Sequence, residues 1–151
     1  MVAETLKLLK QSENVSEIIF TEKELDELIT EKSDRVLVKM ILELLQDSKA
    51  EEIVLIDVRD SSNLADYMFI CEGRSQLHCR GIAENIVFGL KHQGEIHLGI
   101  EGELEGNWVL LDYGNIILHV FHPEIRKYYN LEELYASHQV KDSMNNNNSA
   151  N

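Results

Sequence analysis

Residues 108–121, with the sequence WVLLDYGNIILHVF, carry the clearest structural pattern in the chain. Two runs rich in aliphatic and aromatic residues, 108–112 and 116–121, are separated by Tyr113, Gly114 and Asn115. Glycine and asparagine accept positive φ angles, which tight turns between antiparallel strands often require. The stretch therefore predicts a β-hairpin, and with it a sheet that the other segments must complete.

The segments before the hairpin alternate between helix and strand patterns. Ser33 or Asp34 can cap a helix that ends near Ser48. Its apolar face consists of Leu37, Met40, Ile41, Leu44 and Leu45. Residues 53–58 form an apolar run typical of a strand that is covered on both faces, and residues 67–71 predict a second strand.

A second helix and a short strand complete this pattern. Gly73, Arg74 and Ser75 lead into the helix, which Gly94 is placed to end. Its apolar stripe consists of Cys79, Ile82, Ala83, Ile86, Val87 and Leu90. Residues 96–100 alternate as a strand, and Pro123 opens a short helical segment. This order predicts an α/β fold with a mixed sheet of about five strands and flanking helices.

The length of 151 residues fits one domain with additions at its ends. We expect residues 1–32 to be an acidic N-terminal appendage, helical over residues 16–29, where Thr21 and Glu24 resemble a capping box. Residues 33–140 form the domain, in which Asn130 and Glu133 are placed to cap a last turn. Residues 141–151 form an Asn-rich tail, which the composition predicts to be disordered.

The charge of the chain restricts its partners. Lys plus Arg number 14 and Asp plus Glu number 27, so the formal net charge is -13. This excess argues against a general basic surface for nucleic acid phosphates and against docking on anionic lipid. It favours a basic partner. The two cysteines suit a reducing cytosol, and no apolar run is long enough to span a membrane, so we expect a cytoplasmic protein.

Several residue groups resemble chemical sites without completing one. His119 and His122 are three apart on a strand, where odd spacing directs the two side chains to opposite faces. A Gly-Ser turn before a helix can bind phosphate, but the helix after Ser75 lacks the carboxylate pair that phosphoryl transfer uses to hold metal. We therefore expect Gly73 to make a turn and Ser75 to cap the helix, with Cys71 and Cys79 in the core.

Two groups of acidic residues resemble sites, one for acid–base chemistry and one for calcium. Asp57, Asp60, Asp66 and Asp112 would form an acid–base site only if the fold brought two of them face to face. Glu101, Glu103 and Glu105 alternate like a calcium loop but lack the EF-hand order of ligands, so a solvated acidic loop is the better interpretation.

The interval between Lys91 and Arg126 contains no Lys or Arg. It holds six acids, which are Glu95, Glu101, Glu103, Glu105, Asp112 and Glu124, and it also holds three large aromatic residues, Trp108, Tyr113 and Phe121. Acids around aromatic anchors are typical of a surface that binds a basic protein. A hairpin with its aromatic residues in the core and its acids outside explains the same pattern.

Motifs spread over residues 33–135 resemble those of one known family. The C-terminal motifs are Glu101-Gly102, Trp108 to Gly114, His119 to Phe121, Arg126, Tyr128-Tyr129 and Leu131-Glu132. The upstream ones are Asp57-Val58, Ser61-Ser62, Ala65-Asp66-Tyr67, Gly73, Ser75 and the helix around Ala83. In order and spacing they resemble the ribosomal silencing factor family (RsfS, also called Iojap-like). Asn115 stands where that family usually has Asp, and the N-terminal appendage has no counterpart in its short bacterial pattern.

The resemblance implies a non-enzymatic translational repressor without a cofactor. Proteins of this family bind the large ribosomal subunit at its joining face, through the fourteenth large-subunit ribosomal protein, and hinder association with the small subunit. Their fold looks like a nucleotidyltransferase sheet that has lost its catalytic carboxylates. The partner-binding residues expected here are Trp108, Leu110, Leu111, Asp112 and Tyr113. Strand alternation puts Trp108, Leu110 and Asp112 on one face and Leu111 on the other, which makes Leu111 a candidate for the core.

Other classes of function remain open to the sequence. One is a nucleotide-binding or nucleotidyltransferase-like enzyme, and another is an acidic adaptor for a different basic protein. We expect no sequence-specific contact with nucleic acid. The edge of a mixed sheet can also pair with a second copy of the chain, so a homodimer is compatible with the pattern.

Overall fold

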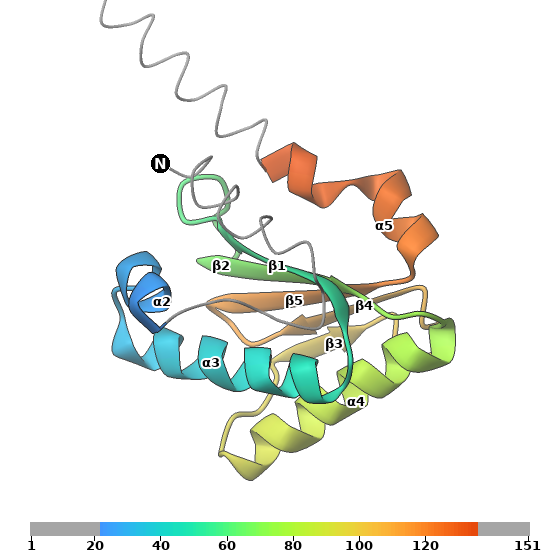
Figure 1. The fold of residues 1–151 in the computed structure, drawn as a ribbon, viewed down its shortest axis with the longest axis horizontal. Helices are drawn as coiled ribbons and strands as arrows, with labels where there is room; N and C mark the ends of the chain where they lie inside the picture. The colour runs from blue at the N-terminus through green and yellow to red at the C-terminus, as the bar shows by residue number, and fades with distance from the viewer. Residues whose placement is uncertain (1–21, 136–151) are drawn as a thin grey trace, which may run out of the picture.

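The structure is a computed structural model, and it describes residues 22–135. Two helices come first, α2 (Glu22–Leu28) and α3 (Lys32–Asp47), followed by β1 (Glu51–Asp57) and β2 (Tyr67–Glu72). The long helix α4 (Gln76–His92) precedes β3 (Gly99–Glu101), β4 (Trp108–Asp112) and β5 (Ile116–Phe121). A short helix, α5 (Pro123–Tyr129), ends this series (Figure 1).

The strands form one mixed sheet in the order β1-β2-β5-β4-β3. Only β2 and β5 run parallel, whereas the other neighbouring pairs are antiparallel. The α4 connection makes the parallel pairing feasible, because parallel neighbours need a long crossover while antiparallel ones need only a turn. The prediction of an α/β fold with a mixed five-stranded sheet and flanking helices is confirmed.

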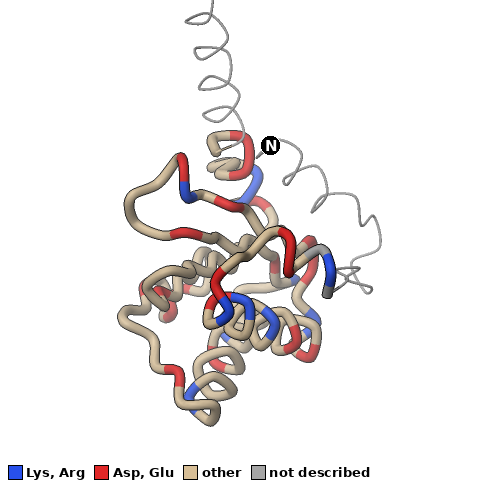
Figure 2. The backbone as a smooth tube through the Cα atoms, turned by 90° about the vertical axis from the view of Figure 1, so that its left-hand side faces the viewer, with Lys and Arg blue, Asp and Glu red and all other residues tan. Residues whose placement is uncertain are grey.

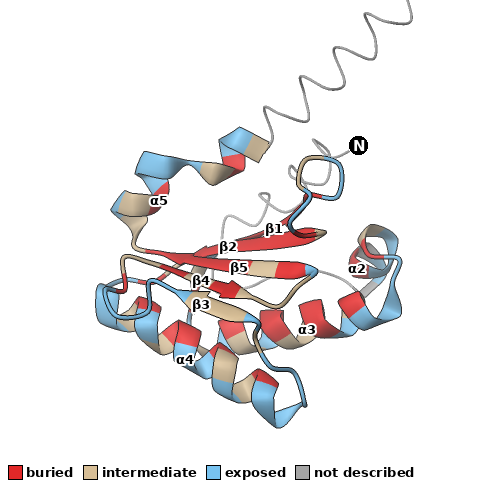
Figure 3. Cartoon of the chain, turned by 180° about the vertical axis from the view of Figure 1, so that it is seen from behind, coloured by how far each residue is buried: buried red, intermediate tan, exposed pale blue. Residues whose placement is uncertain are grey.

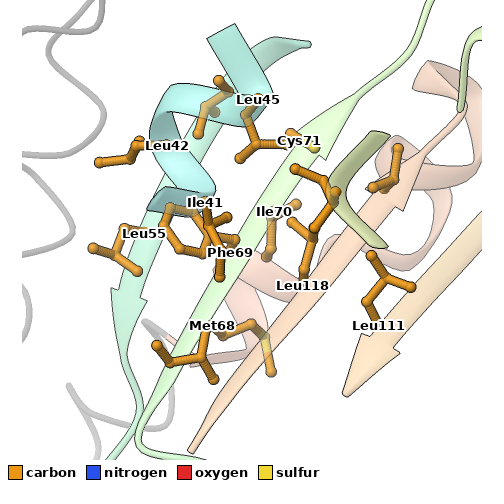
Figure 4. Packing of buried hydrophobic residues seen from close by; sticks show 14 of the residues in the cluster. Ile41, Leu42, Leu45, Leu55, Met68, Phe69, Ile70, Cys71, Leu111 and Leu118 are labelled. Atoms are coloured by element: carbon orange, nitrogen blue, oxygen red, sulfur yellow. The ribbon is translucent and has the colours of Figure 1, made fainter. Parts of the chain in front are cut away.

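Helices α3 and α4 cover one face of the sheet, and α5 lies on the other (Figures 1 and 3). Each long helix turns its buried residues toward the sheet and its exposed ones outward (Figure 3). In the core, Ile41 of α3 lies beside Phe69 of β2, and Leu45 lies beside Cys71 (Figure 4). Leu118 of β5 continues the same layer. Burial of these apolar side chains supplies the main favourable free energy of folding.

Helix α2 contributes to this core. Leu25 and Ile29 are buried, and Asp26 lies 3.7 Å from Arg35 and 3.8 Å from Lys39 on α3. The domain boundary expected at residue 33 stays a prediction, but the segment just before it packs against the domain. The capping box at Thr21 and the Asn-rich tail lie outside the described residues.

Three local predictions differ from the structure. Helix α3 begins at Lys32 with Glu31 as its N-cap, so neither Ser33 nor Asp34 caps it. The strand expected at 96–100 is reduced to β3, because pairing with β4 begins only at Gly99. In the hairpin turn only Gly114 has a positive φ, of 88°, and Asn115 does not. No helix in the described range is long and apolar enough to cross a membrane.

Candidate functional site

Strand β4 divides its side chains between the two faces of the sheet. Val109 and Leu111 are fully buried, whereas Trp108, Leu110 and Asp112 are half-buried. The alternation predicted for this strand is therefore confirmed. Leu111 is 0% exposed and part of the core, which favours a structural role for it over contact with a partner.

Trp108 is held in one orientation by three neighbours. Its indole Nε1–H donates to Nδ1 of His119 at 2.9 Å. Its ring centroid lies 4.8 Å from that of Phe121 and 4.8 Å from that of Tyr129 on α5. His119 is 5% exposed, and burial lowers its pKa to about 4. The imidazole is therefore neutral near pH 7, with Nδ1 available as the acceptor that the indole requires.

Asp112 stabilises the turn of the hairpin. Its Oδ1 accepts a hydrogen bond from the backbone N–H of Gly114 at 2.8 Å, the Asx-type contact that stabilises tight turns. The side chain is nonetheless half-exposed on the same face as Trp108 and Leu110. Any test of its charge must therefore preserve an acceptor for Gly114.

Tyr113, like Trp108, packs part of its ring against the core. It meets His97 edge-on with 6.4 Å between ring centroids. Its hydroxyl is buried, and among the described residues it has no hydrogen-bond partner. Burial, followed by the nearby charge of Glu95, raises the pKa of Tyr113 to about 12, so the phenol stays protonated.

Asn115 joins the hairpin to the start of α3. Its side-chain amide donates to Oδ1 of buried Asp34 at 3.4 Å. Its backbone carbonyl accepts from the N–H groups of Asp66 and Tyr67, at 2.8 and 3.0 Å. A carboxylate at position 115 would lie against that of Asp34, so asparagine suits this position electrostatically.

Three acids at and just after the end of β3 are exposed, namely Glu101 in the strand and Glu103 and Glu105 in the acidic loop that follows. The loop belongs to the interval without Lys or Arg, which also includes the Trp108 row. The end of the molecule that carries α2 and α3 is different, because basic residues there lie among acidic ones and Asp26 pairs with two of them (Figure 2). The interval around the hairpin thus carries six acids with no Lys or Arg among them, whereas α2 and α3 mix acids with cations.

The other groups noted in the sequence have structural roles. Ser75 Oγ accepts from the His78 N–H at 3.0 Å, which confirms the predicted helix cap. A Cβ at Gly73 would lie 2.7 Å from Cys79 Sγ, so close packing of β2 on α4 requires glycine there. Both cysteines are buried in the core, as predicted, and burial raises their thiol pKa values.

Several of the candidate carboxylates and histidines make structural contacts. Asp57 ends β1 and pairs with Arg59 at 2.6 Å, and Asp112 serves the hairpin turn. His122 caps α5, whereas His119 faces Trp108. Within residues 22–135 no group of three His, Cys, Asp or Glu side chains is placed to hold a metal ion.

Sequence reasoning did not identify two contacts beside the site. Tyr129 stacks on Trp108, and Arg126 anchors α5 through a buried bond from Nε to Glu132 at 2.6 Å. The only signal in the sequence was the pair of tyrosines at the end of a Pro-initiated helix. It belonged to the family motif but gave no indication of what the rings contact.

Comparison with known proteins gives consistent matches. A family model named RsfS, described as "Ribosomal silencing factor during starvation", matches residues 30–151. The ribosomal silencing factor RsfS of Halalkalibacterium halodurans is 35% identical over 104 residues, which cover 69% of this chain and 89% of that protein. A mouse protein, "Mitochondrial assembly of ribosomal large subunit protein 1", is 28% identical over 110 residues, covering 71% of this chain and 48% of that protein.

A solved structure agrees with the sequence matches. The crystal structure of a Chromobacterium violaceum protein matches this one with a TM-score of 0.65 and 32% sequence identity. The match covers 67% of this chain and 84% of that chain. Fold, family model and curated relatives thus agree over most of the described residues, and this chain belongs to the RsfS family of ribosomal silencing factors.

Proposed function

We propose that this protein represses translation by occupying the joining face of the large ribosomal subunit, in the cytoplasm, so that the small subunit cannot associate. The contact is made with the fourteenth large-subunit ribosomal protein and requires neither turnover nor a cofactor. Family membership supports this proposal, as does the name of the mouse relative, which refers to the large subunit. The observation that carries it is the half-exposed row of Trp108, Leu110 and Asp112 within an interval free of Lys and Arg.

The row offers two properties that complement a basic protein surface, namely apolar area and negative charge. Trp108 and Leu110 offer apolar area that loses water on contact, and tryptophan is enriched among the residues that dominate binding energies. Asp112 and the exposed acidic loop attract Lys and Arg and so raise the association rate and fix orientation. The same charges repel ribosomal RNA, which directs the protein to a basic protein on the particle.

The first test uses Leu110→Lys, which places a cation in the middle of the row. The side chain is half-exposed, so we expect the domain to stay folded while binding to a basic partner is opposed by like charge. Wild-type protein in excess should shift ribosomes toward free subunits in a sucrose gradient, and the variant should not. Unchanged profiles at saturating wild-type protein would contradict the proposed block of subunit association.

The second test separates charge from turn geometry at Asp112. Asp112→Asn removes the charge but keeps an oxygen that accepts from Gly114, so the hairpin is preserved. We expect the association rate with purified large subunits to fall several-fold and its dependence on salt to weaken. The control is Glu84→Gln on α4, on the opposite face of the sheet, which removes the same charge from an exposed position. Equal effects of both variants would show that only net charge matters.

A further inference from the structure

The row on β4 does not end at Trp108, because two aromatic rings of α5 continue it. The ring of Tyr129 lies 4.8 Å from that of Trp108, and the ring of Tyr128 lies 5.0 Å from that of Tyr129. Tyr129 is 51% exposed and Tyr128 is 81% exposed. An aromatic stripe thus runs from β4 onto the surface of a helix that packs on the same face of the sheet.

Arg126, the buried residue of α5, ties the helix that carries the two tyrosines to the sheet. Its Nη1 donates to the carbonyl of Glu52 at 2.7 Å and lies 3.3 Å from Oε1 of Glu72, while its Nε donates to Glu132. These bonds join α5 to β1, to β2 and to the chain that follows the helix. A rigid presentation of the tyrosines lowers the entropy lost on binding, since their backbone needs no ordering.

The row on β4 is also too small to be a whole interface. A specific protein–protein contact buries about 800 Å² on each partner and involves roughly 20–30 residues a side. Three half-buried side chains on one strand fall well short of this. Tyr128 and Tyr129 are exposed and adjoin Trp108, and tyrosine is enriched at the centres of protein interfaces.

We infer that Tyr128 and Tyr129 form the second half of the docking surface, and that their rings receive Arg or Lys side chains of the basic ribosomal protein. This inference rests on the proposed function. The charge of the surroundings favours a cationic occupant on balance, because six acids and no Lys or Arg lie between Lys91 and Arg126, and Arg126 itself is bonded to carboxylates. Lys127, which precedes Tyr128, is the exposed cation that these acids outnumber. A cation over the face of a tyrosine ring is attracted by the ring quadrupole.

The test compares Tyr128→Ala with Tyr128→Phe. Tyr128 is almost fully exposed, so neither change should disturb the fold. Alanine should weaken the affinity for purified large subunits by at least about tenfold, whereas phenylalanine keeps the ring face and should bind like wild type. Phe88→Ala on α4 is the control, since it removes an exposed aromatic ring from the opposite side of the sheet.

The outcomes distinguish this inference from the function on which it rests. If Tyr128→Ala binds like wild type while Leu110→Lys does not, the stripe is not part of the interface and the proposed function stands. If both variants bind like wild type, neither the row nor the stripe is part of the interface, and the proposed docking surface is wrong. A further experiment uses large-subunit RNA without its proteins as a competitor. If this RNA displaces wild-type protein from the large subunit but does not displace Tyr128→Ala, the rings stack on RNA bases, and the inferred contact with a basic protein is wrong.

Discussion

The two faces of the hairpin differ in what covers them. We call the side of Val109, Leu111, Leu118 and Val120 the covered face, because α3 and α4 close it and all four side chains are fully buried. We call the side of Trp108, Leu110, Asp112 and Ile117 the open face. These four side chains are half-buried, whereas His119 and Phe121 on the same face are buried against Trp108. A single pair of strands therefore stabilises the domain with one set of residues and presents a surface with the other. Adjacent residues in the sequence can thus have unrelated roles.

The largest contrast is expected between Leu111 and Leu110. Leu111→Ala leaves a cavity in the covered face and should lower the free energy of unfolding by about 2–5 kcal/mol. Leu110→Ala, on the open face, should cost less than about 1 kcal/mol. Urea unfolding followed by emission of Trp108, the single tryptophan of the chain, measures both. Similar losses at the two positions would contradict the division of faces.

The pH dependence of stability tests how well His119 is shielded from water beneath Trp108 on the open face. Burial lowers its pKa from 6.5 to about 4, so between these values the unfolded chain binds more protons than the folded one. Stability should be complete above about pH 6.5 and fall by up to about 3 kcal/mol as the pH decreases to about 4. His119→Gln should flatten this part of the pH profile, which denaturation midpoints at pH 7 and pH 5 would show. An unchanged slope in the variant would mean that other groups control it.

Asn115 links the tip of the hairpin to α3, and Asn115→Asp would break that link. The new carboxylate replaces the donor to Asp34 and repels the buried charge, so we expect a loss of about 1–2 kcal/mol at pH 7. Adding Asp34→Asn should restore most of the stability at pH 7. A double variant no more stable than Asn115→Asp would show that repulsion is not the cause.

Local features of both faces could be predicted from the sequence, whereas contacts between distant segments could not. The hairpin, the burial of Leu111 and the Ser75 cap follow from spacing over a few residues, which strand alternation and helix geometry determine. The bond from Asn115 to Asp34 joins residues 81 apart, and that from Arg126 to Glu52 joins residues 74 apart. Such pairings depend on sheet order and on the bulge in β1, neither of which has a local pattern.

The smallest expected effect concerns Tyr113, which continues the alternation of Leu111 past the end of the strand. Its buried hydroxyl lacks a hydrogen-bond partner among the described residues, and leaving such a group unpaired opposes folding. Tyr113→Phe keeps the ring against the core and should therefore raise the free energy of unfolding, by up to about 1 kcal/mol. Binding to the large subunit should not change, since the hydroxyl that this substitution removes is buried. Weaker binding with unchanged stability would instead place this hydroxyl in the interface and extend the docking surface beyond the open face.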